Sequence, residues 1–124
     1  MNVIPQKRRK YKSRLIIQKG SEYTMIGVEH IAMLYIQNRV VFVVDRAQKK
    51  HITSKNLNQL EQELNPDMFF RANRQCIINI NFVRSFKTYD RVKILLELSL
   101  EDASPIIISQ DNAAAFRKWI TEEW

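Results

Sequence analysis

Short runs of β-favouring residues recur along most of the chain, and this pattern restricts the possible folds more than any other feature of the sequence. The run at residues 40–44 has the highest β propensity, because it consists of four valines and one phenylalanine. A long strand–helix alternation is missing, which argues against a doubly wound parallel sheet and predicts a mostly β fold. We expect nine short strands, at residues 15–17, 23–28, 33–36, 40–44, 49–53, 75–80, 82–87, 92–98 and 106–108.

One internal segment changes from strand-like to helical spacing. Leu57, Leu60 and Leu64 stand at i, i+3 and i+7, which places their side chains on one face of a helix. We therefore predict a single short internal helix at residues 56–64, with Ser54 as its N-cap residue.

A second helix is predicted at the C-terminal end, directly after the last strand. Ser109 is its expected N-cap residue, and Phe116, Trp119 and Ile120 recur on one face of it. The chain lacks a three-helix cluster, so a helix-turn-helix is not predicted.

The chain is basic, with 20 Lys and Arg against 13 Asp and Glu and a net charge of +7. Six of these basic residues lie at positions 7–14, so we expect residues 1–13 to form a flexible basic tail and residues 14–124 to form the domain. Residues 39–93 hold 11 basic residues against 5 acids, whereas residues 94–124 hold 2 against 6. This asymmetry indicates one electropositive side, which favours a nucleic-acid partner.

Residues that could form an enzyme site are scarce. His30 and His51 are the only histidines, and neither has a cysteine or a second histidine at metal-ligand spacing. Gly20 and Gly27 are the only glycines, which excludes a glycine-rich phosphate loop. We therefore expect no enzyme activity, no cofactor, no metal and no small-molecule substrate.

The sequence is typical of a cytoplasmic protein. Cys76 is the only cysteine, so no disulfide can form within the chain. No apolar run approaches the ~20 residues that a membrane span requires, and no apolar stretch follows the basic N-terminal residues as it would in a signal peptide.

Three polar segments lie in short connections between the predicted elements, at residues 37–39, 54–56 and 109–112. The second and third stand at helix N-termini, where free N–H groups suit phosphate oxygens. Asn and Gln side chains can pair with adenine, and Arg with guanine, in the major groove. Taken singly, each segment is more typical of an ordinary hairpin tip or helix cap.

Residues 69–83 contain a motif that favours the DNA-binding interpretation. They run FFRANRQCIININFV, which resembles the signature of LytTR domains, roughly F-x-R-x-(H/N)-(R/K)-(S/Q)-x-(I/V)-(I/V)-N followed by the start of a hydrophobic strand. The order of the flanking elements agrees, and the resemblance covers about residues 14–122.

The resemblance implies a mostly β fold of about ten short strands in three small sheets, with short helices. It also implies a bacterial transcription regulator whose loops enter successive major grooves of bent double-stranded DNA. Two protomers are expected on direct repeats. Family members act downstream of a receiver domain or membrane sensor, so the input should come from another polypeptide or a missing segment.

Contact residues can be assigned by matching the family's pattern to this sequence. We expect base contacts from Asn38, Arg39, Lys55, Asn56 and Gln110. We expect contacts with the DNA backbone from Lys49, Lys50, Arg71, Arg74, Ser109 and Asn112.

The third segment departs from the family pattern. The arginine that usually follows the serine is replaced by Gln110, and Asp111 comes next. Gln110 can still pair with adenine, but a guanine contact is lost. This departure leaves open an alternative, a protein-interaction or regulatory module of the same fold without base-specific DNA binding. Asn79, within the signature, is expected to be structural and to bind backbone groups of a loop.

RNA binding is not favoured, because proteins that bind single strands stack bases on exposed aromatic side chains. Tyr35, Phe42 and Phe86 are instead expected to pack within the core or along the strands.

Overall fold

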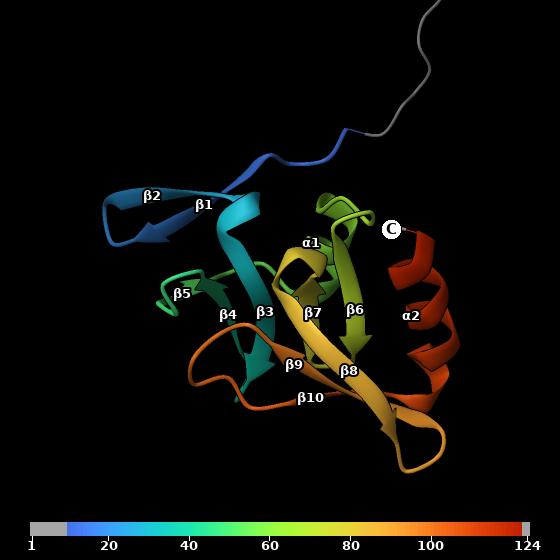
Figure 1. Ribbon diagram of the computed structural model, residues 1–124. Coiled ribbons are helices and arrows are strands. Elements are labelled where there is room, and N and C mark those ends of the chain that lie inside the picture. Colours follow the sequence, from blue (N-terminus) through green and yellow to red (C-terminus); the bar gives the residue numbers. More distant parts are fainter. Residues whose placement is uncertain (1–9, 123–124) are drawn as a thin grey trace, which may run out of the picture.

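Ten strands and two α-helices make up the computed structural model, which describes residues 10–122 (Figure 1). The strands form three antiparallel sheets, in the orders β1-β2, β5-β4-β3-β7-β6 and β10-β9-β8. The elements are β1 (Arg14–Lys19), β2 (Glu22–Gly27), β3 (Ile31–Gln37), β4 (Val40–Asp45), β5 (Lys50–Thr53), α1 (Leu57–Glu63), β6 (Phe69–Asn73), β7 (Cys76–Asn79), β8 (Val83–Tyr89), β9 (Lys93–Leu98), β10 (Ile106–Ile108) and α2 (Gln110–Glu122). Two short 3-10 helices, Val28–His30 and Ile80–Phe82, precede β3 and β8.

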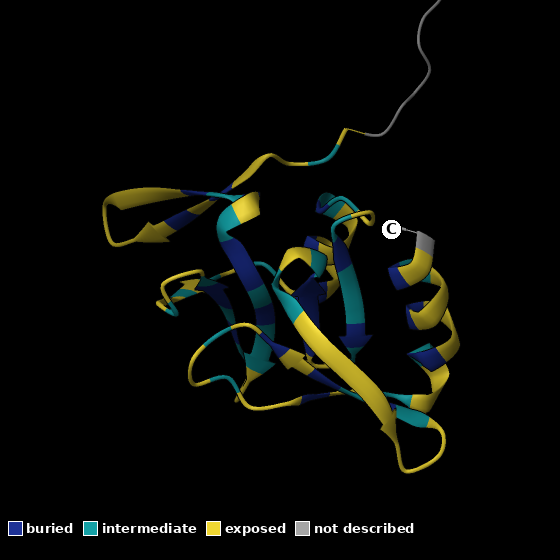
Figure 2. Cartoon of the chain, viewed as in Figure 1, coloured by how far each residue is buried: buried dark blue, intermediate teal, exposed yellow. Residues whose placement is uncertain are grey.

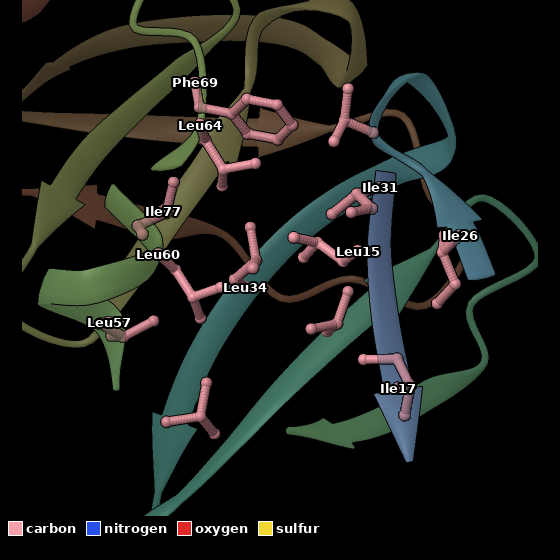
Figure 3. Close-up of a cluster of buried hydrophobic side chains, with 13 residues drawn as sticks. Leu15, Ile17, Ile26, Ile31, Leu34, Leu57, Leu60, Leu64, Phe69 and Ile77 are labelled. Atoms are coloured by element: carbon pink, nitrogen blue, oxygen red, sulfur yellow. The ribbon is translucent and has the colours of Figure 1, made fainter. Parts of the chain in front are cut away.

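The β1–β2 hairpin and α1 pack against one face of the five-stranded sheet. Leu15 and Ile17 are buried and Ile16 is exposed, because successive side chains of a strand point to opposite faces. The two buried residues belong to one hydrophobic cluster with Leu34 of β3 and Leu60 of α1 (Figure 3).

The three-stranded sheet and α2 pack against the opposite face. Cys76 and Ile78 of β7 join a second cluster with Leu96 of β9 and Phe116 of α2. The Phe116 ring meets the ring of Phe86 on β8 edge-on, with the centroids 5.1 Å apart. The five-stranded sheet is therefore the middle layer, with one core on each side.

All nine expected strands are present, and the tenth, which the resemblance implied, is β6. Local patterning misses β6 because its buried residues do not alternate with exposed ones. The expected strand at residues 75–80 ends at Asn79, where a 3-10 turn begins.

The N-cap expected at Ser54 is wrong, because Asn56 caps α1. The Asn56 side chain accepts a hydrogen bond from the N–H of Gln59 (2.8 Å), and the Gln59 side chain accepts one from the N–H of Asn56 (2.9 Å). This reciprocal pair is a capping box, with Asn in place of the usual Ser or Thr.

Part of the expected N-terminal tail is bound to the domain. The N–H of Lys12 donates to the carbonyl of Glu63 (2.9 Å), and the carbonyl of Ser13 accepts from the N–H of Val28 (3.0 Å). Residues 1–9 of that expected tail lie outside the described residues.

Candidate nucleic-acid interface

Three loops that follow strands of the five-stranded sheet meet at one end of these strands. The turn between β3 and β4 lies there, and the pairing of Val41 with Thr53 brings the end of β5 beside it. The N–H of Ile36 donates to the carbonyl of Gln75 (3.0 Å), which places the β6–β7 turn next to the same turn.

The start of α2 is joined to this edge through β6. Asn73 Nδ2 donates to the carbonyl of Ile107 (2.7 Å), and the N–H of Ser109 donates to the carbonyl of Ala72 (3.4 Å). The three predicted polar segments and the turn within the signature therefore lie together at one end of the strands. We call this end of the sheet the loop edge, formed by residues 37–40, 54–56, 73–75 and 109–112.

The β3–β4 turn presents two of the expected base-contacting residues. Asn38 and Arg39 both have positive φ, 52° and 67°, as the two central residues of a type I′ hairpin turn do. Asn tolerates this backbone well, whereas the left-handed region costs a residue such as Arg roughly 1–2 kcal/mol. Both side chains are exposed. The Tyr35 and Phe42 rings stack directly behind the turn with centroids 5.2 Å apart, which confirms their expected packing role.

Arg71 is held inside the fold by four hydrogen bonds. Its Nε donates to the carbonyl of Asn73 (2.8 Å) and its Nη2 to the carbonyl of Arg74 (2.7 Å). Its Nη1 donates to Glu61 Oε1 (2.9 Å) and Asn58 Oδ1 (3.0 Å) on α1. The guanidinium thus fixes the β6–β7 turn against α1, and it leaves the neighbouring Arg74 exposed at the tip.

The residues expected to contact DNA at the starts of α1 and α2 differ in whether their side chains already form bonds within the fold. Lys55 Nζ is 2.6 Å from Glu63 Oε1, and Asn56 uses its side-chain oxygen to cap α1. Asn112 is half-buried, and its Nδ2 donates to the carbonyls of Arg71 (3.3 Å) and Ala72 (3.4 Å). Gln110 is exposed in the first turn of α2.

The two lysines of β5 have different positions. Lys50 Nζ lies 5.6 Å from the centroid of the Tyr35 ring, within reach of a cation–π interaction. Its side chain therefore reaches toward the loop edge. Lys49 lies at the opposite edge of the sheet, where its N–H donates to Asp45 Oδ1 (3.0 Å). We call that edge, residues 28–31, 45–49 and 79–82, the far edge.

An open cleft of about 1160 Å³ borders the loop edge, between the five-stranded sheet and the β9–β10 connection. Gln37, Arg39 and Lys50 line it, and Cys76 lies at its floor. Burial raises the pKa of the Cys76 thiol to about 12, against a smaller opposing effect of the Arg71 charge. The thiol is therefore protonated at neutral pH and is not a reactive nucleophile.

Asn79 has the structural role that the sequence predicted. It is the fully buried polar side chain of the described core, and its Nδ2 donates to the carbonyl of Ile31 (2.8 Å). Its Oδ1 accepts from the N–H of Asn81 (2.8 Å). The first bond joins the end of β7 to the start of β3 at the far edge, and the second holds the 3-10 turn that follows β7.

Arg91, at the tip of the β8–β9 hairpin, was not among the expected contact residues. It is exposed with φ 65°, and it follows Asp90 with φ 49°, so two successive residues have positive φ, as Asn38 and Arg39 do, here within a three-residue loop. A polar residue followed by arginine between two β-prone runs is the shared signal, and it could have identified this turn.

Two kinds of feature are absent from the part of the chain that the structure describes. Within residues 10–122, no three His, Cys, Asp or Glu side chains cluster where they could hold a metal ion. In the same part of the chain, no helix has the length and apolar character to cross a membrane.

Comparison with known proteins assigns the fold. The structure matches the LytTr DNA-binding domain of a protein from Bacillus cereus described as a methyl-accepting/DNA response regulator, with a TM-score of 0.77 and 20% sequence identity. The match covers 88% of this chain and 97% of the other. A comparison with curated proteins finds no match. The family model of the LytTr DNA-binding domain matches residues 21–121, so the chain belongs to the LytTR family of DNA-binding domains.

Proposed function

We propose that this chain binds double-stranded DNA sequence-specifically, as the output module of a bacterial transcription regulator in the cytoplasm. The observation that carries the proposal is the loop edge, where connections from distant parts of the sequence present exposed hydrogen-bonding side chains on a rigid β scaffold. Arg39 and Arg74 are exposed there, and neither has an acidic side chain within 4.0 Å among the described residues.

Base contacts are proposed for the exposed tips of the loop edge. Arg39 has the geometry to donate two hydrogen bonds to guanine, and Asn38 and Gln110 can pair with adenine. Asn56 can join them through its Nδ2, since its Oδ1 caps α1. Lys55 can join them only by giving up its ion pair with Glu63.

Backbone contacts are proposed for residues that flank these tips. Arg74, Lys50 and Ser109 can approach phosphates directly, and they would set the register of the protein on the duplex. Arg71 and Asn112 are proposed to act indirectly, because their polar atoms hold the β6–β7 turn and the start of α2 in place. Lys49 is left out of the proposed set, since it lies at the far edge.

Two protomers are proposed to bind a direct repeat, each entering successive major grooves of bent DNA. A single loop edge covers one face of the duplex, so a second protomer one helical turn away, about 34–36 Å, would occupy the same face. The regulatory input would come from a receiver domain or sensor on another polypeptide or segment.

The alternative function is a protein-interaction or regulatory module that does not contact bases. The observation that favours it is the start of α2, where the exposed carboxylate of Asp111 directly follows Gln110. Such a carboxylate repels phosphate, although it also stabilises the first turn of its own helix.

The test is selection of binding sites from a random duplex library, followed by salt-dependent affinity for the enriched sequence. A short repeated motif spaced by about one helical turn is expected. If six to eight phosphates are engaged, log K should fall against log salt with a slope of roughly −5 to −7. Sequence-blind binding by the wild type would contradict the proposal and favour the alternative function.

A further inference from the structure

The hairpin of β8 and β9 is largely exposed along β8 and at its tip. Every residue of β8 after Val83 is exposed, as Figure 2 shows by its yellow colour. Among the described strands β8 pairs only with β9, so its outer edge carries no neighbour. Tyr89 and Val92 are 41% and 42% exposed at the end of the hairpin.

The hairpin extends past the start of α2. Ile94 of β9 pairs with Ile108 of β10, and α2 begins two residues later at Gln110. Beyond this pair β8 and β9 continue to the turn at Asp90 and Arg91, so the tip projects beside the first turn of α2 (Figure 1). Phe86 packs against Phe116 and fixes the hairpin to that helix.

The tip is basic, and its charges have no acidic partner. Lys87, Arg91 and Lys93 stand against the single acid Asp90 in residues 87–93. None of the three basic side chains comes within 4.0 Å of a carboxylate in the described part of the chain. By the strand register, Lys87 and Lys93 lie on the outer face of the sheet, opposite the face that buries Ile94.

The turn keeps an arginine where a glycine would fit better. Arg91 has φ 65°, a left-handed backbone that glycine adopts without strain and that arginine does not favour. Arg39 in the β3–β4 turn has a similar φ of 67°. Gln48 at the far edge has the same kind of backbone, so what distinguishes Arg39 and Arg91 is an exposed guanidinium without an acidic partner among the described residues.

We propose that the β8–β9 hairpin is an additional DNA-contacting arm, which places Arg91 and Lys93 against the phosphates that flank the α2 side of the binding site. This inference rests on the proposed function, and it adds a contact that lengthens the protected segment of duplex. DNA is the partner that fits, because the arm adjoins the loop edge, and its side chains supply charge without base-reading amides.

The test uses the double variant Arg91→Gly/Lys93→Ala in the full chain. Glycine removes the guanidinium and relieves the strained backbone, so the thermal midpoint of unfolding should stay equal or rise. Binding to a long duplex at physiological salt should weaken about tenfold, and the log–log salt slope should become shallower by about 2. Hydroxyl-radical footprinting should show protection lost on one flank only.

The matched control is Lys19→Ala/Arg46→Ala, which removes two exposed charges from the β1–β2 turn and the far edge. It should keep the wild-type slope and footprint. Specific binding with an unchanged slope in the Arg91→Gly/Lys93→Ala variant overturns the inference and leaves the proposed function standing. Sequence-blind wild-type binding with the slope reduced in that variant supports the arm and overturns the proposed function. A wild type that binds no duplex overturns both.

Discussion

At the far edge of the five-stranded sheet the side chains of Asp45 and Asn79 are bonded within the fold, whereas at the loop edge Arg39 and Arg74 have no acidic partner among the described residues. Asp45 is the clearest case at the far edge. Its Oδ1 accepts hydrogen bonds from the N–H groups of Ala47 (2.9 Å) and Lys49 (3.0 Å), and its Oδ2 lies 3.0 Å from His51 Nε2. These contacts close the β4–β5 turn with side chains of the same segment.

Arg39 and Arg74 at the loop edge are exposed, without such partners among the described residues. The strands of this sheet therefore end in bonded polar side chains at the far edge and in exposed, unpaired cations at the loop edge. A polar group satisfied within the fold contributes to folding, while an exposed, unpaired cation contributes little to it and remains available for a ligand. Substitution of Asp45 or Asn79 should therefore lower stability, and substitution of Arg39 or Arg74 should change binding alone.

The largest effect is expected for Asn79→Ala at the far edge. The change leaves the buried carbonyl of Ile31 and the N–H of Asn81 without their partners. The free energy of unfolding should fall by about 2–3 kcal/mol, measured by urea denaturation. Asn81→Ala is the control, because this side chain is exposed, and its effect should stay within about 0.5 kcal/mol. Equal losses in the two variants would show that Asn79 is not what joins β7 to β3.

The second prediction compares the two ends of β4, where Arg39 precedes the strand and Arg46 follows it. Arg39→Ala should weaken specific DNA binding by about 1–3 kcal/mol if it contacts a guanine. Arg46→Ala removes the same charge at the far edge and should bind like the wild type. Fluorescence anisotropy on the selected duplex measures both, and comparable losses would show that net charge, not position, determines binding.

The third prediction separates neighbours within the signature. Arg71→Ala removes four hydrogen bonds and should lower the free energy of unfolding by about 1–2 kcal/mol, while it weakens binding to all DNA sequences alike. Arg74→Ala should leave the unfolding free energy within about 0.5 kcal/mol and still weaken binding. Unfolding curves and anisotropy on cognate and unrelated duplexes separate the two effects. Unchanged stability in Arg71→Ala would mean that its bonds are replaced by water.

Much of the fold could be predicted because its determinants are local. The run at residues 40–44 and the spacing of Leu57, Leu60 and Leu64 record which side chains are buried, and the structure buries Leu57, Leu60 and Leu64. The cap of α1 was misassigned because Ser54 and Asn56 are both good N-cap residues, and the partner at Gln59 decides between them. Strand β6 has no alternation, so only the family motif revealed it.

The candidate site was less predictable, because it depends on contacts between distant segments. No local pattern shows that Arg71 donates to Glu61 or that Lys55 pairs with Glu63. These ion pairs distinguish the cations that have an acidic partner from those that have none among the described residues. The loop edge likewise exists only through strand register, such as the pairing of Val41 with Thr53. Sequence supplied the residue types, and the topology supplied their grouping.

The smallest expected effect is the pH dependence contributed by Asp45. Partial burial raises the pKa of its carboxyl, but hydrogen bonds from His51 and from the N–H groups of Lys49 and Ala47 outweigh burial and hold the pKa below its ordinary value of 3.8. A carboxyl whose pKa is lowered by folding stabilises the native state above its unfolded pKa, and this contribution is lost as the pH falls through the folded pKa. Wild-type stability should therefore fall more steeply below about pH 4 than that of Asp45→Asn, as measured by acid-dependent thermal unfolding.

Asp67→Asn is the control for this last comparison, because it removes an exposed carboxylate outside both edges. Its acid transition should follow that of the wild type, while the transition of Asp45→Asn should be flatter. If all three curves have the same slope, the bonds to Asp45 do not stabilise the β4–β5 turn. The far edge would then depend on Asn79 alone among the polar groups tested, and the contrast between the two edges would be confined to β3 and β7.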